Sequence, residues 1–292
     1  MTDRKRQGLF VGLTTLDLIY HAPRSPQSNE KIVATDLTLA AGGPATNAAI
    51  LFSVLGGEAK LLSVIGQHPL TTLIHHDLNR YEVTSIDLNP ATPEPPSCAS
   101  IVVSTQGDRA VVSRNAQGLE ADPSQIPPDL LEGVQVVLMD GHQLPVSIAI
   151  AQQAADRGIP TVLDGGSWKK GLDQLLPWIS ELICSADFRA PHCRTESETL
   201  NYLQQRYSPH LRIAITHGSE PIDCWTEQGR GQIPCPSVPC LDTLGAGDFF
   251  HGAFSYYCLE MGWSDALAKA ADLASFSCGF RGTRSWLSKI VS

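Results

Sequence analysis

Residues 240–254 hold the side chains of this sequence that are best suited to chemistry. Within this stretch Gly245, Ala246 and Gly247 carry little or no side chain, so the backbone can turn sharply and leave its N–H groups uncovered. The apolar residues that follow recur at helical spacing. A glycine-rich turn at the start of a helix is a ready anion site, because free N–H groups and the positive end of the macrodipole point outward together. Beside a bound phosphate, Asp248 can accept a proton from an attacking hydroxyl. This arrangement indicates phosphoryl transfer.

A second polar cluster precedes a helix in the N-terminal part of the chain. Gly42 and Gly43 permit close approach of a ligand, and Asn47 offers a donor and an acceptor to neighbouring hydroxyls. Asp17 follows the first expected strand, at the end of the sheet where ligands of α/β proteins collect. On the residues alone, a plain loop-to-helix junction and a turn aspartate explain these positions as well.

The elements that must position these residues alternate along the chain. Apolar runs of strand length lie at 9–13, 60–65, 134–139, 160–163, 181–184 and 212–216, and helical patterns lie at 45–55, 70–81, 146–157, 196–206, 248–261 and 265–280. Gly158 and Gly262 occupy positions that suit C-terminal helix caps. Alternation of this kind predicts βαβ units and a mostly parallel sheet covered on both faces.

One stretch departs from this alternation and predicts a small separate β-sheet. Residues 99–104 and 110–114 read as a hairpin whose turn contains Gly107, and residues 32–39 have partial β alternation. The expected architecture is therefore a single α/β domain over 1–292, with a β lid formed by segments near 14–40 and 97–115.

Composition limits the classes of function. The chain has 292 residues, 42% of them hydrophobic, and a formal net charge of −9 with no basic stripe, which argues against nucleic-acid binding. No apolar segment is long enough to span a membrane, and no signal peptide is recognised. The eight cysteines have no C-x-x-C or zinc-like spacing and indicate a reducing compartment. We therefore expect a cytoplasmic protein with small-molecule ligands.

Together these segments resemble the PfkB (ribokinase-like) family of carbohydrate and nucleoside kinases. Gly42-Gly43 with Asn47 is similar to the N-terminal signature of that family, and Asp242-Thr243-Leu-Gly-Ala-Gly-Asp248 to its C-terminal signature. The resemblance covers nearly the whole chain. It implies a ribokinase-like three-layer α/β/α fold with a β lid, and transfer of the γ-phosphoryl group of ATP to a sugar hydroxymethyl group.

The resemblance also implies roles for single positions. Asp248 would be the general base, and Gly245, Ala246 and Gly247 the anion hole for the transferred group. Asp17, Gly42, Gly43 and Asn47 would contact the sugar, while Thr216 and Gly218, with Gly245 and Gly247, would contact ATP. Asp242 and Thr243 fall where some members bind a monovalent cation such as K⁺. Mg²⁺ is expected with ATP, and the lid can form a homodimer interface in related proteins.

Departures from the family pattern concern the metal and the nucleotide. The Asn-x-x-Glu motif that orders water around Mg²⁺ in many members is replaced by Ser185-Ala-Asp187-Phe188, so the metal ligands stay unknown. Arg281 and Arg284 are candidates to neutralise the nucleotide. Two alternatives remain open: a nucleoside kinase, against which the lack of aromatic residues at 99–119 argues, and a catalytically weak sugar or nucleotide sensor.

Overall fold

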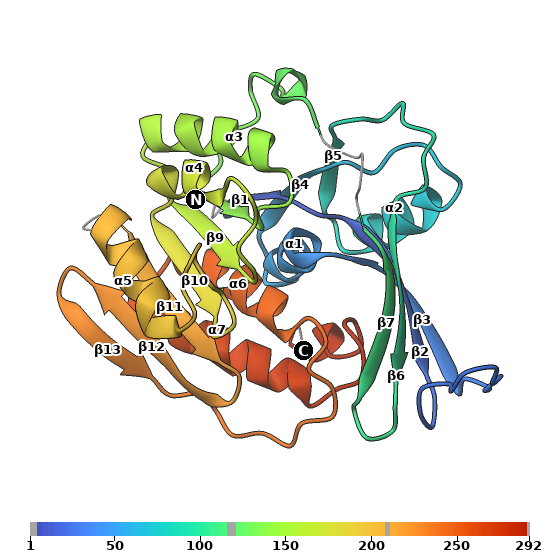
Figure 1. The fold of residues 1–292 in the computed structure, drawn as a ribbon. Coiled ribbons are helices and arrows are strands. Elements are labelled where there is room, and N and C mark those ends of the chain that lie inside the picture. Colours follow the sequence, from blue (N-terminus) through green and yellow to red (C-terminus); the bar gives the residue numbers. More distant parts are fainter. Residues whose placement is uncertain (1–4, 116–120, 208–210, 291–292) are drawn as a thin grey trace.

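The computed structural model describes residues 5–115, 121–207 and 211–290, which contain two sheets and two layers of helices (Figure 1). The nine-stranded sheet has the order β13-β12-β11-β10-β9-β8-β1-β4-β5, and its strands are parallel apart from β12 and β13. Their bounds are β1 Gln7–Val11, β4 Glu58–Ser63, β5 Thr84–Asp87, β8 Val136–Met139, β9 Thr161–Gly165, β10 Glu181–Ser185, β11 Arg212–His217, β12 Glu220–Thr226 and β13 Gly229–Ile233. This confirms the mostly parallel sheet.

Two buried clusters hold the helices against opposite faces of this sheet. On β1, Phe10 belongs to one cluster and its neighbours Leu9 and Val11 to the other, as the two-residue period of a strand requires. The helices are α1 Pro44–Val54, α2 Thr71–Arg80, α3 Leu144–Asp156, α4 Leu172–Leu175, α5 Glu196–Tyr207, α6 Ala246–Tyr257 and α7 Trp263–Cys278, with short 3₁₀ turns at Pro123–Gln125, Leu176–Trp178 and Leu287–Lys289. The cluster around Phe10 includes residues of α1, α2, α6 and α7, and the other includes residues of α3 and α5. The three-layer architecture is confirmed.

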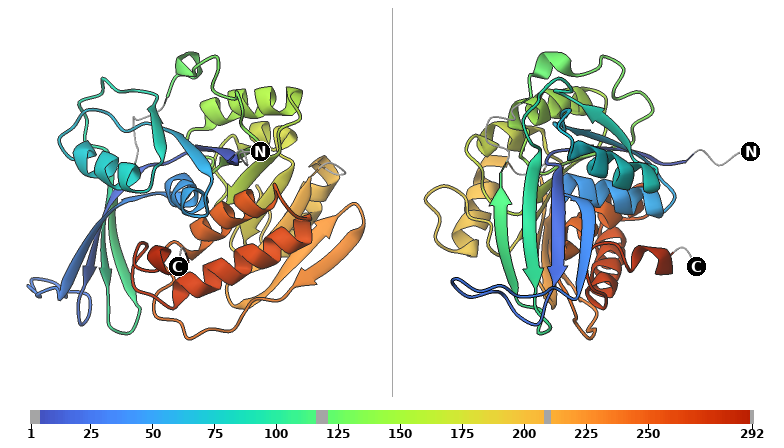
Figure 2. Two further views of the ribbon diagram at one scale, coloured as in Figure 1. Left: turned by 180° about the vertical axis from the view of Figure 1, so that it is seen from behind. Right: turned by 90° about the vertical axis from the view of Figure 1, so that its right-hand side faces the viewer.

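The second sheet has four strands and stands beside the main body (Figure 2). Its order is β3-β2-β6-β7, with β2 Thr15–His21, β3 Asp36–Gly42, β6 Ser97–Val103 and β7 Arg109–Arg114. The expected hairpin is β6–β7, and Gly107 has a φ of +87° in its turn. The small sheet, as we call these four strands, follows directly from β1, so it lies near the carboxyl ends of the main strands.

Two sequence expectations need correction. Gly158 follows the end of α3 with a φ of +67°, as expected of a C-terminal cap, but Gly262 does not end a helix. The helix α6 stops at Tyr257, and Gly262, with a φ of −61°, is the N-cap of α7. Asp17 lies within β2 and not in a turn after β1, because the chain continues from β1 into a second strand after only three residues.

The helices α1 and α6 pack unusually closely, and we expect Gly252→Ala to be destabilising. A Cβ at Gly252 would lie 2.5 Å from the backbone oxygen of Ala48, so the two helices would have to move apart. Such overpacking typically costs about 1–3 kcal/mol. Urea unfolding should show this loss, whereas Gly231→Ala, at a glycine where an added Cβ would meet no atom within 4 Å, should stay within about 0.5 kcal/mol of the parent. Equal stability of the two variants would contradict the close packing.

Candidate active site

The sugar-side candidates from the sequence come together where the small sheet meets α1. The side chain of Asp17 in β2 lies against Gly42, so that a Cβ added at Gly42 would lie 1.9 Å from Asp17 Oδ2. Gly43 has a φ of +101°, and a Cβ on it would lie 2.2 Å from the oxygen of Leu13. Both glycines are therefore required by the local geometry.

Asp17 is a buried carboxylate in a polar setting. Its side chain accepts a hydrogen bond of 2.6 Å from Thr15 Oγ1. Burial raises the pKa of Asp17 above its usual value, while the bond from Thr15 and the charge of Arg284 act to lower it. The other carboxylate oxygen, Asp17 Oδ2, faces Gly42 and accepts no hydrogen bond from the described residues. It is therefore an acceptor without a partner among the described residues, on the side where the sequence predicts the sugar.

Asn47 and Asp248 bring the two signatures into direct contact. Asn47 Nδ2 in α1 donates a hydrogen bond of 2.7 Å to Asp248 Oδ2 in the first turn of α6, across 201 residues of sequence. Burial raises the pKa of Asp248 to about 7, and the nearby charge of Asp164 adds to the rise, whereas the bond from Asn47 lowers it. A carboxylate with a pKa near neutrality is suited to accept a proton at physiological pH.

The glycine turn, as we call Gly245, Ala246 and Gly247, begins α6 with Gly245 at a φ of +76°. A Cβ on Gly247 would meet no atom within 4 Å, so its surroundings are open. The N–H of Ala246 donates to the oxygen of Thr243 at 3.2 Å, whereas no residue in the described part of the chain accepts from the N–H of Gly245 or Gly247. The expectation of three free N–H groups is corrected to two, since the sharp turn folds the middle one back on the chain.

A cavity of about 560 Å³ lies in front of the glycine turn. Ala246 and Gly247 line one part of it, and Thr216 and Gly218, at the β11–β12 turn, line another. The two nucleotide segments expected from the sequence therefore share one cavity. Its remaining walls come from the segment after β13 and from α6 and α7, including Val238, Phe250, Ala271, Ala274 and Cys278.

Asp242 and Thr243, the expected monovalent-cation positions, have protein partners. The carboxylate of Asp242 accepts from the N–H of Leu244 and of Gly282, each at 2.9 Å. Thr243 Oγ1 accepts from Arg109 Nη2 of the small sheet at 3.1 Å. The contacts of Asp242 shape the glycine turn, and the guanidinium beside Thr243 places a positive charge where K⁺ was expected.

The segment that replaces the Asn-x-x-Glu motif offers little to a metal ion. Ser185 Oγ donates to the oxygen of Gly166, Asp187 is exposed and Phe188 is buried. The residues present do not fit that motif. Among the described residues, the carboxylate whose charge acts most on Asp248 is Asp164, at the end of β9.

Two residues organise the site in roles that the sequence did not predict. Asp140, at the end of β8, is 1% exposed and accepts from the N–H of Leu13, Ala45 and His142, so it joins the end of β1 to the start of α1. Arg284 was expected near the nucleotide but donates to Asn47 Oδ1 at 3.0 Å, beside the residues for which the sequence predicts sugar contacts. Neither residue belongs to a recognisable motif, because their partners are distant in sequence.

Arg281 also lies away from the expected nucleotide contacts. With Arg284 it lines a different cavity of about 580 Å³, between the ends of α1 and α2 and the C-terminal loop. Neither arginine is among the residues that line the cavity in front of the glycine turn.

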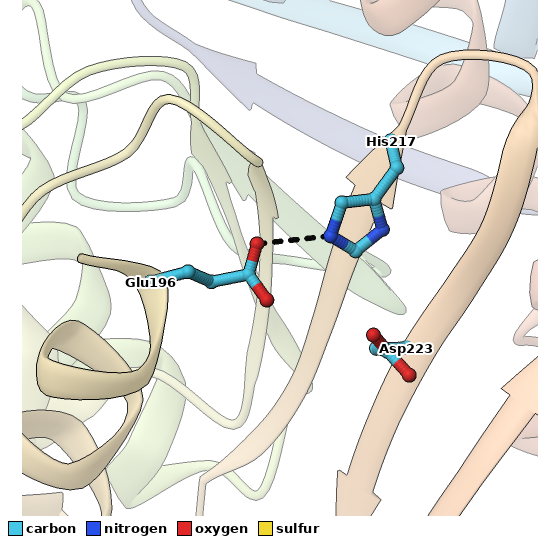
Figure 3. A group of neighbouring side chains, drawn as sticks. All are labelled: Glu196, His217 and Asp223. Carbon is cyan, nitrogen blue, oxygen red and sulfur yellow. Dashed lines mark hydrogen bonds and ion pairs between the residues drawn. The ribbon is translucent and has the colours of Figure 1, made fainter.

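A polar group lies beside the β11–β12 turn (Figure 3). A ring nitrogen of His217 and carboxylate oxygens of Glu196 and Asp223, atoms of the kind that bind metal ions, lie within 4.8 Å of one another. Burial lowers the pKa of His217, but hydrogen bonds to Glu196 and to the oxygen of Pro221 raise it more, so its pKa is above the usual value. Because both ring nitrogens face oxygens, at 2.9 and 3.2 Å, a protonated ring accounts for the geometry. The group fixes the turn that bears Gly218 to α5.

Residues 6–290 match the model of the pfkB family carbohydrate kinases. The chain belongs to this family. As a pfkB family member it is a kinase that acts on a sugar hydroxyl, which confirms the resemblance seen in the sequence.

Relatives of this pfkB family member are distant but match over nearly their whole length. The deoxyribokinase of Salmonella typhi is 24% identical, with 94% of this chain and 93% of the relative covered. The ribokinase of Bacillus subtilis is 24% identical, with 97% and 98% covered. The structure of Arabidopsis thaliana ribokinase complexed with ribose and ATP superposes with a TM-score of 0.75 at 18% identity and covers 99% of each chain. No helix in the described residues is long and apolar enough to cross a membrane.

The raised pKa of Asp248 predicts a stability change that depends on pH. Because the folded-state pKa is about 7 and the ordinary value is 3.8, ionised Asp248 opposes folding, and the stability present below pH 4 is lost as the pH rises through 7. Asp248→Asn should therefore be more stable than the parent at pH 8, by up to about 4 kcal/mol, and the difference should disappear near pH 4.

Urea unfolding at a series of pH values measures this difference. The exposed Asp187→Asn is the matched control for the removal of a carboxylate that is not buried. An offset in Asp248→Asn that does not change with pH would show that burial does not raise the pKa of Asp248.

Proposed function

We propose that the chain transfers the γ-phosphoryl group of ATP to the hydroxymethyl group of a sugar, with Asp248 as general base. The observation that carries this proposal is the position of Asp248, at the N-terminus of α6 between the sugar-side cluster and the cavity of the glycine turn. Its raised pKa suits proton transfer near neutral pH. The names of the relatives, ribokinase and deoxyribokinase, favour a pentose as acceptor.

In the proposed mechanism, the side chains and backbone groups described above bind the sugar, accept the proton and stabilise the transferred group. Asp17 and the backbone at Gly42 and Gly43 hold the sugar hydroxyls, and the second N–H of Asn47 is left for the acceptor. Asp248 takes the proton as the hydroxyl oxygen attacks the γ-phosphorus. The bond from that phosphorus to the bridging oxygen breaks, and ADP leaves. The N–H groups of Gly245 and Gly247 stabilise charge on the transferred group; a donor of this kind is worth about 3 kcal/mol.

ATP would occupy the cavity lined by Thr216, Gly218 and Gly247. Mg²⁺ would accompany its phosphates, neutralise their charge and be held mostly by phosphate oxygens and water, since Ser185 and Phe188 cannot replace the family motif. Dependence on K⁺ at Asp242 and Thr243 stays a prediction, which the neighbouring Arg109 makes less favourable. A cytoplasmic location, where ATP is available, also stays a prediction.

A sugar or nucleotide sensor is the alternative from another class. The missing Mg²⁺ motif favours it, but a pure binding protein has no need of a carboxylate with a pKa near 7 beside two N–H groups for which the described residues offer no acceptor.

We expect Asp248→Asn to lower the rate of phosphoryl transfer by orders of magnitude while preserving the fold, because the amide cannot accept the proton. Removal of a general base typically costs 10²- to 10⁴-fold in rate, about the loss expected here. The measurement is ADP release with D-ribose, 2-deoxy-D-ribose, D-fructose and nucleosides as acceptors, with mass spectrometry of the product.

The outcomes of this panel are distinct. Asp187→Asn should keep the parent rate. Near-normal turnover of Asp248→Asn would remove Asp248 from the role of base. Binding of a sugar and ATP by the parent without transfer to any acceptor would favour the sensor, and transfer to nucleosides alone would favour the nucleoside kinase.

We further propose that the small sheet acts as a lid and pairs with a second copy of the chain. Leu39, Leu18, Ser100 and Val112 are directly opposite one another across the four strands and therefore share a face. Leu39 is 43% and Val112 78% exposed, and Leu37, in the next row on that face, is 47% exposed. Exposed apolar side chains in adjacent rows favour a protein interface.

A double variant, Leu39→Lys with Val112→Lys, should convert a dimer into a monomer because it places charges in this face. Sedimentation velocity at several concentrations measures the state. Leu73→Lys, at an exposed apolar residue of α2, is the control and should leave the dimer intact. A parent chain that is monomeric at all concentrations would contradict the interface.

A further inference from the structure

Arg284 is a buried arginine whose partners come from three separate elements. Its side chain is 9% exposed and lies in the C-terminal loop after α7. Nε donates to Asp77 Oδ2 in α2 at 3.1 Å, Nη1 donates to Asn47 Oδ1 in α1 at 3.0 Å, and Nη2 donates to the oxygen of Ala41 in β3. One guanidinium therefore ties the start of α1 to the small sheet and to α2.

The bond to Asn47 decides how the amide of that residue is oriented. A guanidinium has only donors, so the amide must present its oxygen to Arg284 and its nitrogen to the other side. On that other side, Asn47 Nδ2 donates to Asp248 Oδ2 at 2.7 Å. If the amide were reversed, its oxygen would face a carboxylate and its nitrogen a cation, and both contacts would be repulsive. Arg284 thus selects the orientation in which Asn47 can bond Asp248.

We propose that Arg284 is a positioning residue for phosphoryl transfer: it holds the amide of Asn47 so that an N–H is directed at the carboxylate of Asp248. This inference rests on the proposed function of Asp248. Arg284 itself contacts neither phosphate nor acceptor in this role, and it acts on the reaction through Asn47.

The charges around Arg284 fit this role. Asp77, whose side chain is 10% exposed, also accepts a hydrogen bond from the backbone N–H of Ala41 at 2.9 Å. The carboxylate that pairs with Arg284 is therefore also bonded to the backbone next to Gly42. The charge of Arg284 also acts to lower the pKa of Asp17 against burial. Loss of Arg284 would leave Asp77 buried without a cation, which itself is expected to destabilise the fold.

The residues around Asp248 allow the effect of Arg284 on its carboxylate to be separated from the effects of the other charged and polar groups nearby. The groups that act on Asp248 are Asn47 from α1, Asp164 from β9, Asp140 from β8 and His251 from α6. Of these, only Asn47 contacts Arg284. The most direct route from Arg284 to Asp248 is therefore through Asn47.

A double-mutant cycle tests the link in the reaction. Arg284→Met and Asn47→Ala should each lower kcat by about 10- to 100-fold, and the double variant should be no slower than Asn47→Ala alone, because both changes remove the same hydrogen bond. Arg284→Lys should recover part of the rate. Arg281→Met, in the same loop with an exposed side chain, is the control and should keep the parent kcat. Losses that multiply in the double variant would overturn the proposal.

A second measurement does not depend on activity. In ¹³C NMR of carboxyl-labelled protein, the pKa of Asp248 should be higher in Arg284→Met than in the parent, because the stabilising bond from Asn47 is weakened, and Arg284→Lys should be intermediate. An unchanged pKa in Arg284→Met would overturn the proposal. If the parent transfers no phosphoryl group, the proposed function fails, while this titration still decides whether Arg284 acts on Asp248.

A substitution at Asp77 separates the positioning effect of Arg284 from its effect on folding stability, because it removes the carboxylate that would be left unpaired. In Asp77→Asn the amide oxygen can still accept from Ala41, so Arg284→Met in this background does not leave a carboxylate at position 77 buried without its cation. The kcat loss and the pKa rise should persist there. Their disappearance in this background would assign the effect to the Asp77 ion pair and overturn the role assigned to Arg284.

Discussion

The hydrogen bond between Asn47 and Asp248 is the contact on which the rest of the site depends. It joins the first turn of α1 to the first turn of α6, and each of these turns follows a glycine segment with a left-handed backbone. An ionised carboxylate is costly to bury, so it needs a donor that is itself held in place. That requirement explains why the donor is an amide fixed on its other side by a buried arginine.

The surrounding structure keeps these two turns together. Asp140 binds the end of β1 to the start of α1, and Asp242 binds the glycine turn to the loop after α7 through Gly282. Both are buried carboxylates that accept backbone N–H groups, a use of aspartate that stabilises sharp turns where several strands end. The acceptor side and the cavity of the glycine turn are therefore positioned by backbone contacts as much as by side chains.

Much of this arrangement could be predicted from the sequence, because its signals are local. The two glycine segments, the parallel strands and the β6–β7 hairpin each have a short pattern of their own. The strands β5, β12 and β13, at the two ends of the main sheet, were not expected, since their half-exposed residues do not form a continuous apolar run. Arg284 was assigned to the nucleotide because a single sequence does not reveal that its partners, Asn47 and Asp77, lie 237 and 207 residues away.

The backbone contact between Gly252 and Ala48 has a consequence for how substrate preference can diverge among related chains. Since α1 and α6 touch without intervening side chains, the proposed reacting groups that they carry cannot be shifted by repacking at that point. New acceptors must then be accommodated by residues of the small sheet and the loops around it, which can vary while the reacting centre stays the same.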